Sequence, residues 1–186
     1  MKAKLKTVFI IALVILVLDH ITKGLVVAYI PLGGRIPVIP NIFDLVHARN
    51  TGAAFGFLDD WNSPLKDWFF YIVALIAMVF LYFYVKSIEA SDKLSLFALS
   101  FIFGGALGNV GDRLFRGSVV DFLSVHYHNQ VVDWNIFGWY LKFPLIWPAF
   151  NVADMAISSA IVLLIWQSFR GSNNDMGLRK KLIEGD

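Results

Sequence analysis

Four long apolar stretches divide the chain. They run over residues 7–29, 68–85, 94–113 and 150–168. Each is close to the roughly 20 residues that an α-helix needs to cross the hydrocarbon core of a membrane. The second stretch has no charged residue, and the other three have their acidic residues near one end. The pattern predicts an all-α integral membrane protein with four transmembrane helices, whose acidic ends lie on one side of the membrane.

Composition and length agree with this interpretation. Hydrophobic residues make up 58% of the chain and charged residues 16%, and the mean hydropathy of +0.65 is far from that of a soluble domain. Four spans and their loops fill 186 residues, so we expect a single domain over 1–186 that ends in a polar cytoplasmic tail from about residue 171. The net charge of +2 argues against a nucleic-acid partner. The absence of cysteine excludes disulfides, thiol nucleophiles and cysteine zinc sites.

Basic residues indicate the orientation. Nine of the sixteen lie in the two termini or in the short loop between the second and third apolar stretches. These nine are Lys2, Lys4, Lys6, Lys86, Lys93, Arg170, Arg179, Lys180 and Lys181. Because Lys and Arg accumulate on the cytoplasmic side of membrane proteins, both termini are predicted to be cytoplasmic. The acidic helix ends and the belt of Trp61, Trp68, Trp134, Trp139 and Trp147 then lie at the outer surface.

The two outer loops differ in character. The first, residues 31–64, has period-two segments bounded by Gly and Pro, which predicts a small β-sheet cradle on the membrane face. The second, residues 123–149, is dense in aromatic residues. An amphipathic segment resting at the membrane interface is the expected structure of that loop.

Asp121 and Asp154 are the strongest candidates for chemistry, and they flank the second outer loop. An ionised carboxylate beside hydrocarbon is costly, so such residues face a cavity, pair with a base or react. Two adjacent carboxylates share one proton, which lets one activate water while the other donates to a carbonyl. The alternative is that each acid caps a helix or pairs with a basic residue. Asp154 fits that alternative, because acids favour the first turn of a helix.

Several polar residues accompany the two acids. Asn109, Asp112 and Arg113 lie at i, i+3 and i+4, on one helix face. Asp112 and Arg113 could simply neutralise each other. Asn109 follows closely spaced glycines that include Gly108, which indicates close helix contact and an amide that points into the bundle. Asn151, three residues before Asp154, can present its amide to the same cavity.

The remaining candidates lie in the first helix and the first outer loop. Asp19 and Lys23 at i and i+4 form either an intrahelical salt bridge or a binding element. Asn50 and Gly52 open a turn of small residues that lets backbones approach closely. No metal site is expected: His126 and His128 have a two-residue spacing without further ligands, and no His-Glu-x-x-His motif occurs.

Five motifs together resemble the lipoprotein signal peptidase family, also called signal peptidase II. They are the segments 19–23 (Asp-His-Ile-Thr-Lys), 50–55 (Asn-Thr-Gly-Ala-Ala-Phe), 104–113 (Gly-Gly-Ala-Leu-Gly-Asn-Val-Gly-Asp-Arg), 117–122 (Gly-Ser-Val-Val-Asp-Phe) and 150–154 (Phe-Asn-Val-Ala-Asp). The motifs occur in the family's order. The resemblance implies a bacterial inner-membrane aspartyl peptidase, active near the periplasmic side without metal or cofactor. Such an enzyme, expected to be a monomer in membrane lipid, removes the signal peptide of prolipoproteins just before a diacylglyceryl-modified cysteine and is inhibited by globomycin.

The resemblance also assigns residues. The family's catalytic pair falls on Asp121 and Asp154. Positions that the family uses around the site fall on Asp19, Lys23, Asn50, Gly52, Gly108, Asn109, Asp112, Arg113 and Asn151. Two departures are His20, where Gln is usual, and a gap between Asp121 and Asn151 that is longer than in most members.

Two other classes of membrane protein compete with the peptidase. Buried acids with a basic partner also form proton relays, so a small proton-coupled transporter is the main alternative. Transporters more often show internal repeats with broken helices at the midplane, whereas this chain shows no repeat and its acids cluster at one edge. A structural membrane subunit would not need two acids and three asparagines close together.

Overall fold

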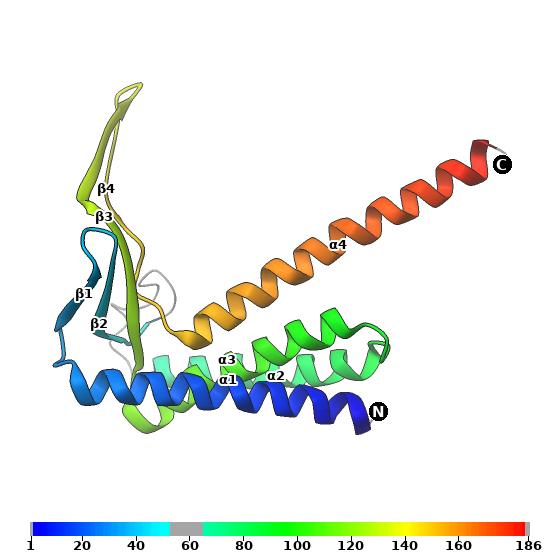
Figure 1. Cartoon of the computed structure of the whole chain (residues 1–186), viewed down its shortest axis with the longest axis horizontal. Helices are drawn as coiled ribbons and strands as arrows, with labels where there is room; N and C mark the ends of the chain where they lie inside the picture. Colours follow the sequence, from blue (N-terminus) through cyan, green and yellow to red (C-terminus); the bar gives the residue numbers. More distant parts are fainter. Residues whose placement is uncertain (1, 53–64, 185–186) are drawn as a thin grey trace.

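The computed structural model describes residues 2–52 and 65–184, without the side chains of 171–184 and of a few other positions. Within these residues it has four helices and four strands. The helices are α1 (Lys2–Tyr29), α2 (Leu65–Ser87), α3 (Lys93–Arg116) and α4 (Val152–Glu184). The strands are β1 (Arg35–Ile39), β2 (Phe43–Asn50), β3 (Val119–Ile136) and β4 (Trp139–Ile146). The sheet lies at one end of the helices (Figure 1).

The prediction of four spanning helices is confirmed, since each is long and apolar enough to cross a membrane. α1 begins earlier than expected, and α4 continues to Glu184, past the expected end at residue 168. The outward faces of the helices are apolar and exposed, for example at Phe9, Ile76 and Val162. Lipid can cover such faces, as expected for helices that lie in a bilayer.

Local signals fix the ends of α3. The Asp92 side chain accepts a hydrogen bond from the backbone N–H of Ser95 at 3.0 Å and caps the first turn. Asp92 also accepts hydrogen bonds from Gln167 of α4, and the bonds from Ser95 and Gln167 outweigh its desolvation and lower its pKa. Gly117 ends the helix in the left-handed conformation, with φ at 73°, and its N–H donates to Arg113. β3 therefore starts directly beyond the end of α3, close to the helices.

The all-α label is too narrow, because the chain forms a four-stranded antiparallel sheet in the order β1-β2-β3-β4. The sheet was predicted in the first outer loop alone, which supplies β1 and β2, but β3 and β4 come from the second outer loop. The second outer loop, predicted as an amphipathic segment at the membrane interface, thus forms a long hairpin. Its β-branched and aromatic residues favour strands, and pairing with β2 supplies the backbone hydrogen bonds.

Glycines bring the helices into close contact. A Cβ atom at Gly104 would lie 2.7 Å from the carbonyl oxygen of Ala12, and one at Gly105 would lie 2.6 Å from that of Ala153. Such distances do not occur for real Cβ atoms, so α1 and α4 can approach α3 only at glycine. This is the small-residue packing typical of membrane helices.

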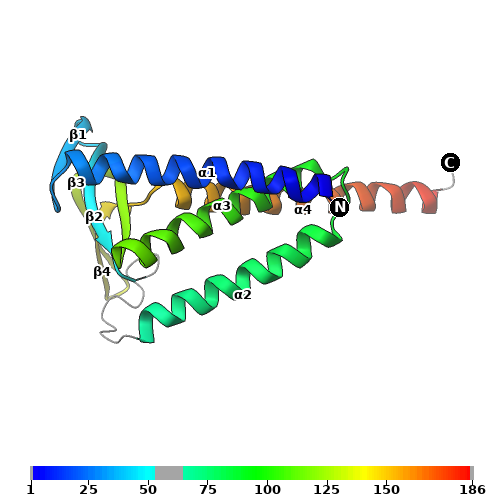
Figure 2. The same cartoon turned by 90° about the horizontal axis from the view of Figure 1, so that it is seen from below.

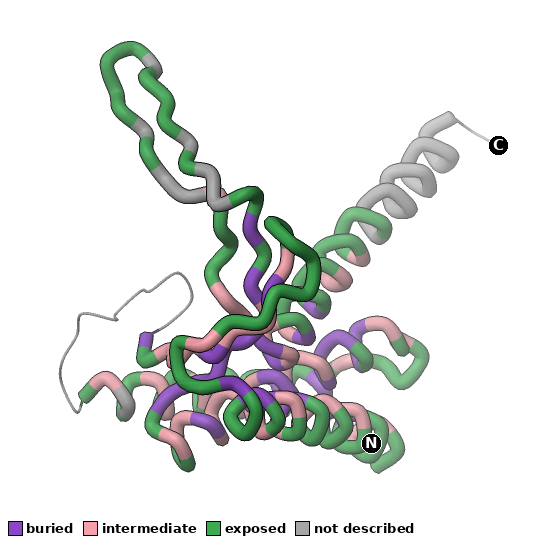
Figure 3. The backbone as a smooth tube through the Cα atoms, turned by 60° about the vertical axis from the view of Figure 1, so that its left-hand side comes forward, coloured by how far each residue is buried: buried purple, intermediate pink, exposed green. Residues whose placement is uncertain are grey.

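Buried apolar residues form two clusters, one near the start of α1, around Val8, Val85 and Leu99, and one where the sheet meets the helices (Figure 3). Val26 and Ile30 at the end of α1 pack against Val120 and Phe122 of β3. The start of α1 and the end of α4 lie at the other end of the molecule, away from the sheet (Figure 2). The Lys- and Arg-rich segments near the two termini are therefore on one side, opposite the sheet.

Candidate active site

A cavity of about 730 Å³ opens where β2, β3, α3 and the start of α4 meet. Its polar lining includes Asn50, Asn109, Arg113, Asp121 and Asp154. Apolar residues of α4, such as Met155 and Ile157, line the side of the cavity that runs along this helix. The two candidate acids thus face one cavity, although 33 positions separate them in the chain.

Asp121 lies on β3 and is almost completely buried, with 3% of its surface exposed. Its Oδ2 accepts a hydrogen bond from Asn50 Nδ2 at 3.0 Å, and its Oδ1 accepts one from Asn151 Nδ2 at 2.7 Å. Burial, with the negative charge of Asp154 adding to it, raises the pKa of Asp121 from 3.8 to about 6, although the two amide hydrogen bonds oppose the shift. The fold therefore favours a proton on this carboxyl group.

Asp154 both caps α4 and belongs to the cavity. Its Oδ2 accepts a hydrogen bond from the backbone N–H of Asn151 at 3.1 Å, and Asn151 Oδ1 accepts one from the backbone N–H of Asp154 at 3.0 Å. This reciprocal arrangement is a capping box. The other oxygen, Oδ1, accepts from Asn109 Nδ2 at 2.9 Å. The capping alternative is thus correct, and it leaves Asp154 in the cavity.

Asn151 links the two acids. Its backbone N–H donates to Asp154, and its side-chain Nδ2 donates to Asp121. The same amide nitrogen also lies 3.2 Å from Asn109 Oδ1. Since Asn151 is completely buried, its position holds the two carboxylates at a fixed separation.

Lys23 fixes the orientation of Asn109. Lys23 Nζ donates to Asn109 Oδ1 at 3.0 Å, and an ammonium group has no acceptor. The amide oxygen of Asn109 must therefore face Lys23, and its NH₂ group is directed to Asp154. A residue of α1 in this way determines a hydrogen bond made to the start of α4.

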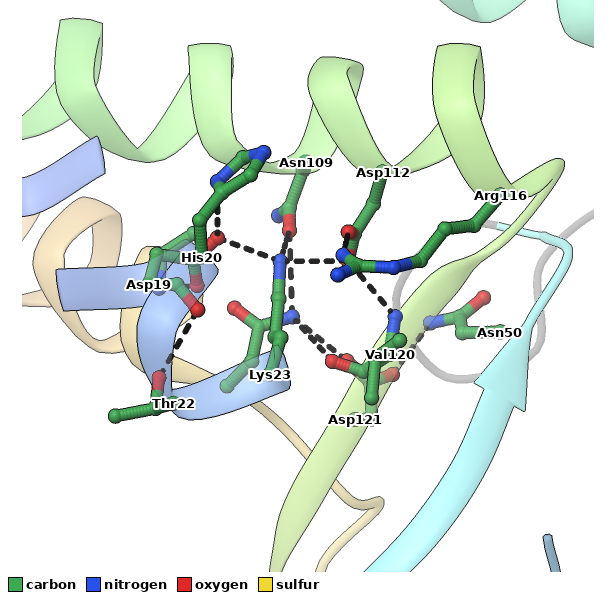
Figure 4. A network of polar contacts seen from close by, with 12 residues as sticks. Asp19, His20, Thr22, Lys23, Asn50, Asn109, Asp112, Arg116, Val120 and Asp121 are labelled. Carbon is green, nitrogen blue, oxygen red and sulfur yellow. Dashed lines mark hydrogen bonds and ion pairs between the residues drawn. The ribbon is translucent and has the colours of Figure 1, made fainter. Parts of the chain in front are cut away.

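Lys23 is itself held by two acids in an interior without exposure to solvent (Figure 4). Its Nζ lies 2.7 Å from Asp19 Oδ2 and 3.0 Å from Asp112 Oδ2. Asp19 Oδ1 accepts from the backbone N–H of Ala153, and Asp112 Oδ2 accepts from that of Val120. The network joins α1, α3, β3 and α4 directly behind the cavity.

The suggestion that Asp112 and Arg113 neutralise each other is wrong. Asp112 pairs with Lys23 and with Arg116, which is four residues further along α3. Adjacent residues on a helix point in different directions, whereas residues at i and i+4 are neighbours. Arg113 instead donates to the Gly52 carbonyl and stacks on Phe70, with 4.4 Å from its guanidinium carbon to the ring centroid.

Two glycines and a histidine complete the predicted set. A Cβ atom at Gly108 would lie 2.5 Å from Asp19 Oδ2, so only glycine leaves room for the buried ion pair. Gly52 donates its N–H to Asn50 Oδ1 at 3.0 Å, which turns the amide NH₂ of Asn50 to Asp121. His20 lies against Gly111 at the edge of the network rather than in the cavity. Residues 53–55 of the 50–55 motif, and Trp61, lie outside the described residues.

Sequence reasoning missed some residues near the site. Arg49 and Trp147 line the cavity. A second buried cluster holds the sheet together: Asp44 lies 2.7 Å from His126 and 2.5 Å from Arg35. His126 Nε2 thus contacts the Asp44 carboxylate. Among the described residues, no group of three His, Cys, Asp or Glu side chains could hold a metal.

Comparison with known proteins identifies the family. The family model described as signal peptidase (SPase) II matches residues 11–170. A lipoprotein signal peptidase of Syntrophotalea carbinolica is 39% identical over 168 residues, which are 90% of this chain and 94% of the relative. This chain belongs to the lipoprotein signal peptidase family. It is an aspartic peptidase that acts on prolipoproteins, and nothing in these comparisons supports the transporter alternative.

Solved structures agree with this assignment. The peptidase is similar to a bacterial membrane enzyme solved by the in meso method at 2.3 Å resolution, with a TM-score of 0.72 and 31% identity over 91% of each chain. A second bacterial membrane enzyme, solved at 1.9 Å, has a TM-score of 0.67 and 31% identity over 87% of this chain and 92% of its own. The four helices and the sheet therefore form the fold of a bacterial membrane enzyme.

Proposed function

We propose that Asp121 and Asp154 are the catalytic pair of this peptidase and share one proton. The observation that carries the proposal is that both acids line one cavity and both bond to the buried Asn151. Asp121 holds the proton, because its pKa is raised to about 6. Asp154 is its partner, and the two oxygens of Asp154 accept hydrogen bonds from Asn151 and Asn109.

In this mechanism water is the nucleophile. The ionised carboxylate takes a proton from the water as its oxygen attacks the scissile carbonyl carbon, and the protonated carboxyl group donates to the carbonyl oxygen. The tetrahedral intermediate then collapses: the C–N bond breaks, and the leaving amine takes up a proton from the pair. Asn50, Asn109 and Arg113 line the cavity beside the peptide, and the buried Asn151 positions the two acids.

The substrate meets the cavity from the membrane. We propose that the diacylglyceryl chains of the modified cysteine remain among lipid tails, where each buried methylene contributes about 0.8 kcal/mol. The apolar side of the cavity along α4, with Met155 and Ile157, then receives the lipid-modified residue. The basic termini opposite the sheet support a bacterial inner-membrane location with cytoplasmic termini and a periplasmic active site. The peptidase would act there as a monomer.

Cleavage should depend on the lipid. We expect a diacylglyceryl-modified precursor to be cut much faster than the same precursor without lipid, because only the modified form is held at the depth of the cavity. A gel-shift assay of both precursors in one membrane preparation measures this, with globomycin as the inhibitor control. Equal cleavage of the two precursors would contradict a lipid-recognising site.

The pH dependence of kcat/KM should report the loss of the proton from Asp121. Because catalysis needs that proton and the pKa of Asp121 is about 6, kcat/KM should fall above that pH, by about tenfold per pH unit. Asn50→Ala removes a hydrogen bond that lowers this pKa, so the falling limb should move to higher pH. The matched control is Asn135→Ala at the far end of β3, which should leave the limb in place. If kcat/KM of Asn50→Ala fell at the same pH as that of the wild type, this would argue against Asp121 as the proton carrier.

A further inference from the structure

The outer part of the β3–β4 hairpin has two chemically different faces. We call residues 131–146 the hairpin arm. Its register pairs Trp134 with Leu141, Ile136 with Trp139 and Asp133 with Lys142. Residues paired across an antiparallel ladder share a face, and successive residues alternate. One face therefore takes positions 132, 134, 136, 139, 141 and 143, which the sequence fills with Val, Trp, Ile, Trp, Leu and Phe.

The opposite face is polar in the outer part of the arm, beyond the pair of Val131 and Pro144 at its base. Asp133 and Lys142 form an exposed ion pair there, with 3.4 Å between Oδ2 and Nζ. Asn135 and Tyr140 occupy the next pair of positions toward the tip. The strand register thus makes the arm amphipathic. The bulge between His126 and Val131 interrupts the alternation of apolar and polar residues along β3, so the alternation is not evident from the sequence.

Trp134 and Trp139, the side chains of the apolar face that the structure describes, are not covered by other described residues. Trp134 is 57% exposed and Trp139 80% exposed. At the tip, Phe137 is fully exposed, with φ at 51°, and Gly138 follows with φ at 87°. A turn with two positive φ angles favours Asn-Gly or Asp-Gly, and a bulky residue at its first position is unusual. The chain therefore places a large apolar side chain at a strained and open position.

The arm is also placed at the membrane boundary. It projects from the sheet-bearing end of the helices and runs across their direction, not along it (Figure 1). Exposed apolar side chains also recur along the chain that joins the arm to the helices, at Ile146, at Trp147 and at Met155 near the start of α4. The arm is therefore attached to the helices through a segment whose apolar side chains a bilayer can cover.

From its exposed apolar side chains and its position at the end of the helices, we propose that the hairpin arm is a membrane-binding element. Its apolar face and Phe137 lie in the lipid interface at the sheet-bearing end of the helices, and its polar face is turned to water. Trp and Tyr are the residues that favour this depth of a bilayer. Binding depends on apolar contact rather than on anionic headgroups, because Asp133 and Lys142 cancel and the arm has no other Lys, Arg, Asp or Glu.

The test uses single cysteine labels, which the cysteine-free chain makes straightforward. Trp139→Cys and Tyr140→Cys are a matched pair, since the two residues are adjacent, are 80% and 79% exposed, and lie on opposite faces. Each full-length variant carries a fluorescent label and is reconstituted into phosphatidylcholine vesicles. Brominated lipid then reports contact with acyl chains, and iodide reports contact with water. Cleavage of a lipid-modified precursor verifies that both variants are folded.

The label at 139 should be quenched several-fold more by brominated lipid than the label at 140, and iodide should give the reverse order. Adding anionic lipid should change neither result. Equal quenching of both labels by iodide would show that the arm stands in water and would overturn the proposal. A second result would also overturn the proposal: the label at 139 is protected from iodide more strongly as the protein density in the vesicles rises, and brominated lipid does not quench it. A second copy of the protein would then cover the apolar face.

Discussion

Asp121→Asn should reduce the rate of signal-peptide release from a lipid-modified precursor by about 10²- to 10⁴-fold, the range expected for loss of a general acid–base group. An amide at this position cannot donate the shared proton or take it back. The amide keeps one acceptor oxygen, so one of the two hydrogen bonds from Asn50 and Asn151 can remain, and substrate binding should change less than turnover. Single-turnover cleavage at saturating enzyme measures the chemical step separately from binding.

The stability of the same variant should depend less on pH than that of the wild type. Burial raises the pKa of Asp121 above its unfolded value of 3.8 to about 6, so the folded state binds this proton more tightly. As pH rises through that window, the wild type loses stability on the order of 3 kcal/mol from this group, whereas an amide loses none. The unfolding midpoint of Asp121→Asn relative to wild type should therefore rise between pH 4 and 7.

The matched control is Asp133→Asn, which replaces an exposed acid on the same strand. It should keep both the cleavage rate and the pH dependence of stability of the wild type. Undiminished turnover in Asp121→Asn would exclude Asp121 from the chemistry. Loss of turnover together with a collapsed unfolding midpoint would instead indicate a structural role.

The spans could be predicted from sequence because lipid leaves few choices for the backbone. A chain that crosses hydrocarbon must satisfy its own hydrogen bonds, so a long apolar stretch becomes a helix. The second outer loop was harder to predict, because its aromatic residues suit an interfacial helix as well as a strand. Bulges between Leu45 and Ala48 and between His126 and Val131 interrupt the period-two pattern that would have distinguished the two structures.

The site was predictable only at the level of residue types. Two acids and three asparagines in an apolar chain indicate a polar interior, but not which atom bonds to which. The bond from Lys23 to Asn109 joins residues 86 positions apart and depends on how closely α1 approaches α3. Gly104 and Gly108 permit that approach, and only the packed structure shows which side chains they leave room for.

Lys23→Met should destabilise the protein by about 3–5 kcal/mol, the usual cost of leaving a buried charge without its partner. The substitution keeps the apolar stem but leaves Asp19 and Asp112 facing each other without the ammonium group between them. Asn109 would also lose the donor that orients its amide toward Asp154. Thermal unfolding in detergent and the cleavage rate should therefore both fall.

A second substitution separates the two roles of Lys23, which are to balance the buried charge and to orient the Asn109 amide. In the double variant Asp19→Asn with Lys23→Met the buried charge is again balanced, because Asp112 keeps its pair with Arg116. Most of the lost stability should return, since a neutral replacement of a buried pair is often well tolerated. Cleavage should stay low, because methionine cannot donate to Asn109 and the amide is free to turn its oxygen toward Asp154. Recovery of cleavage together with stability would mean that Lys23 acts only through charge balance and does not position Asn109.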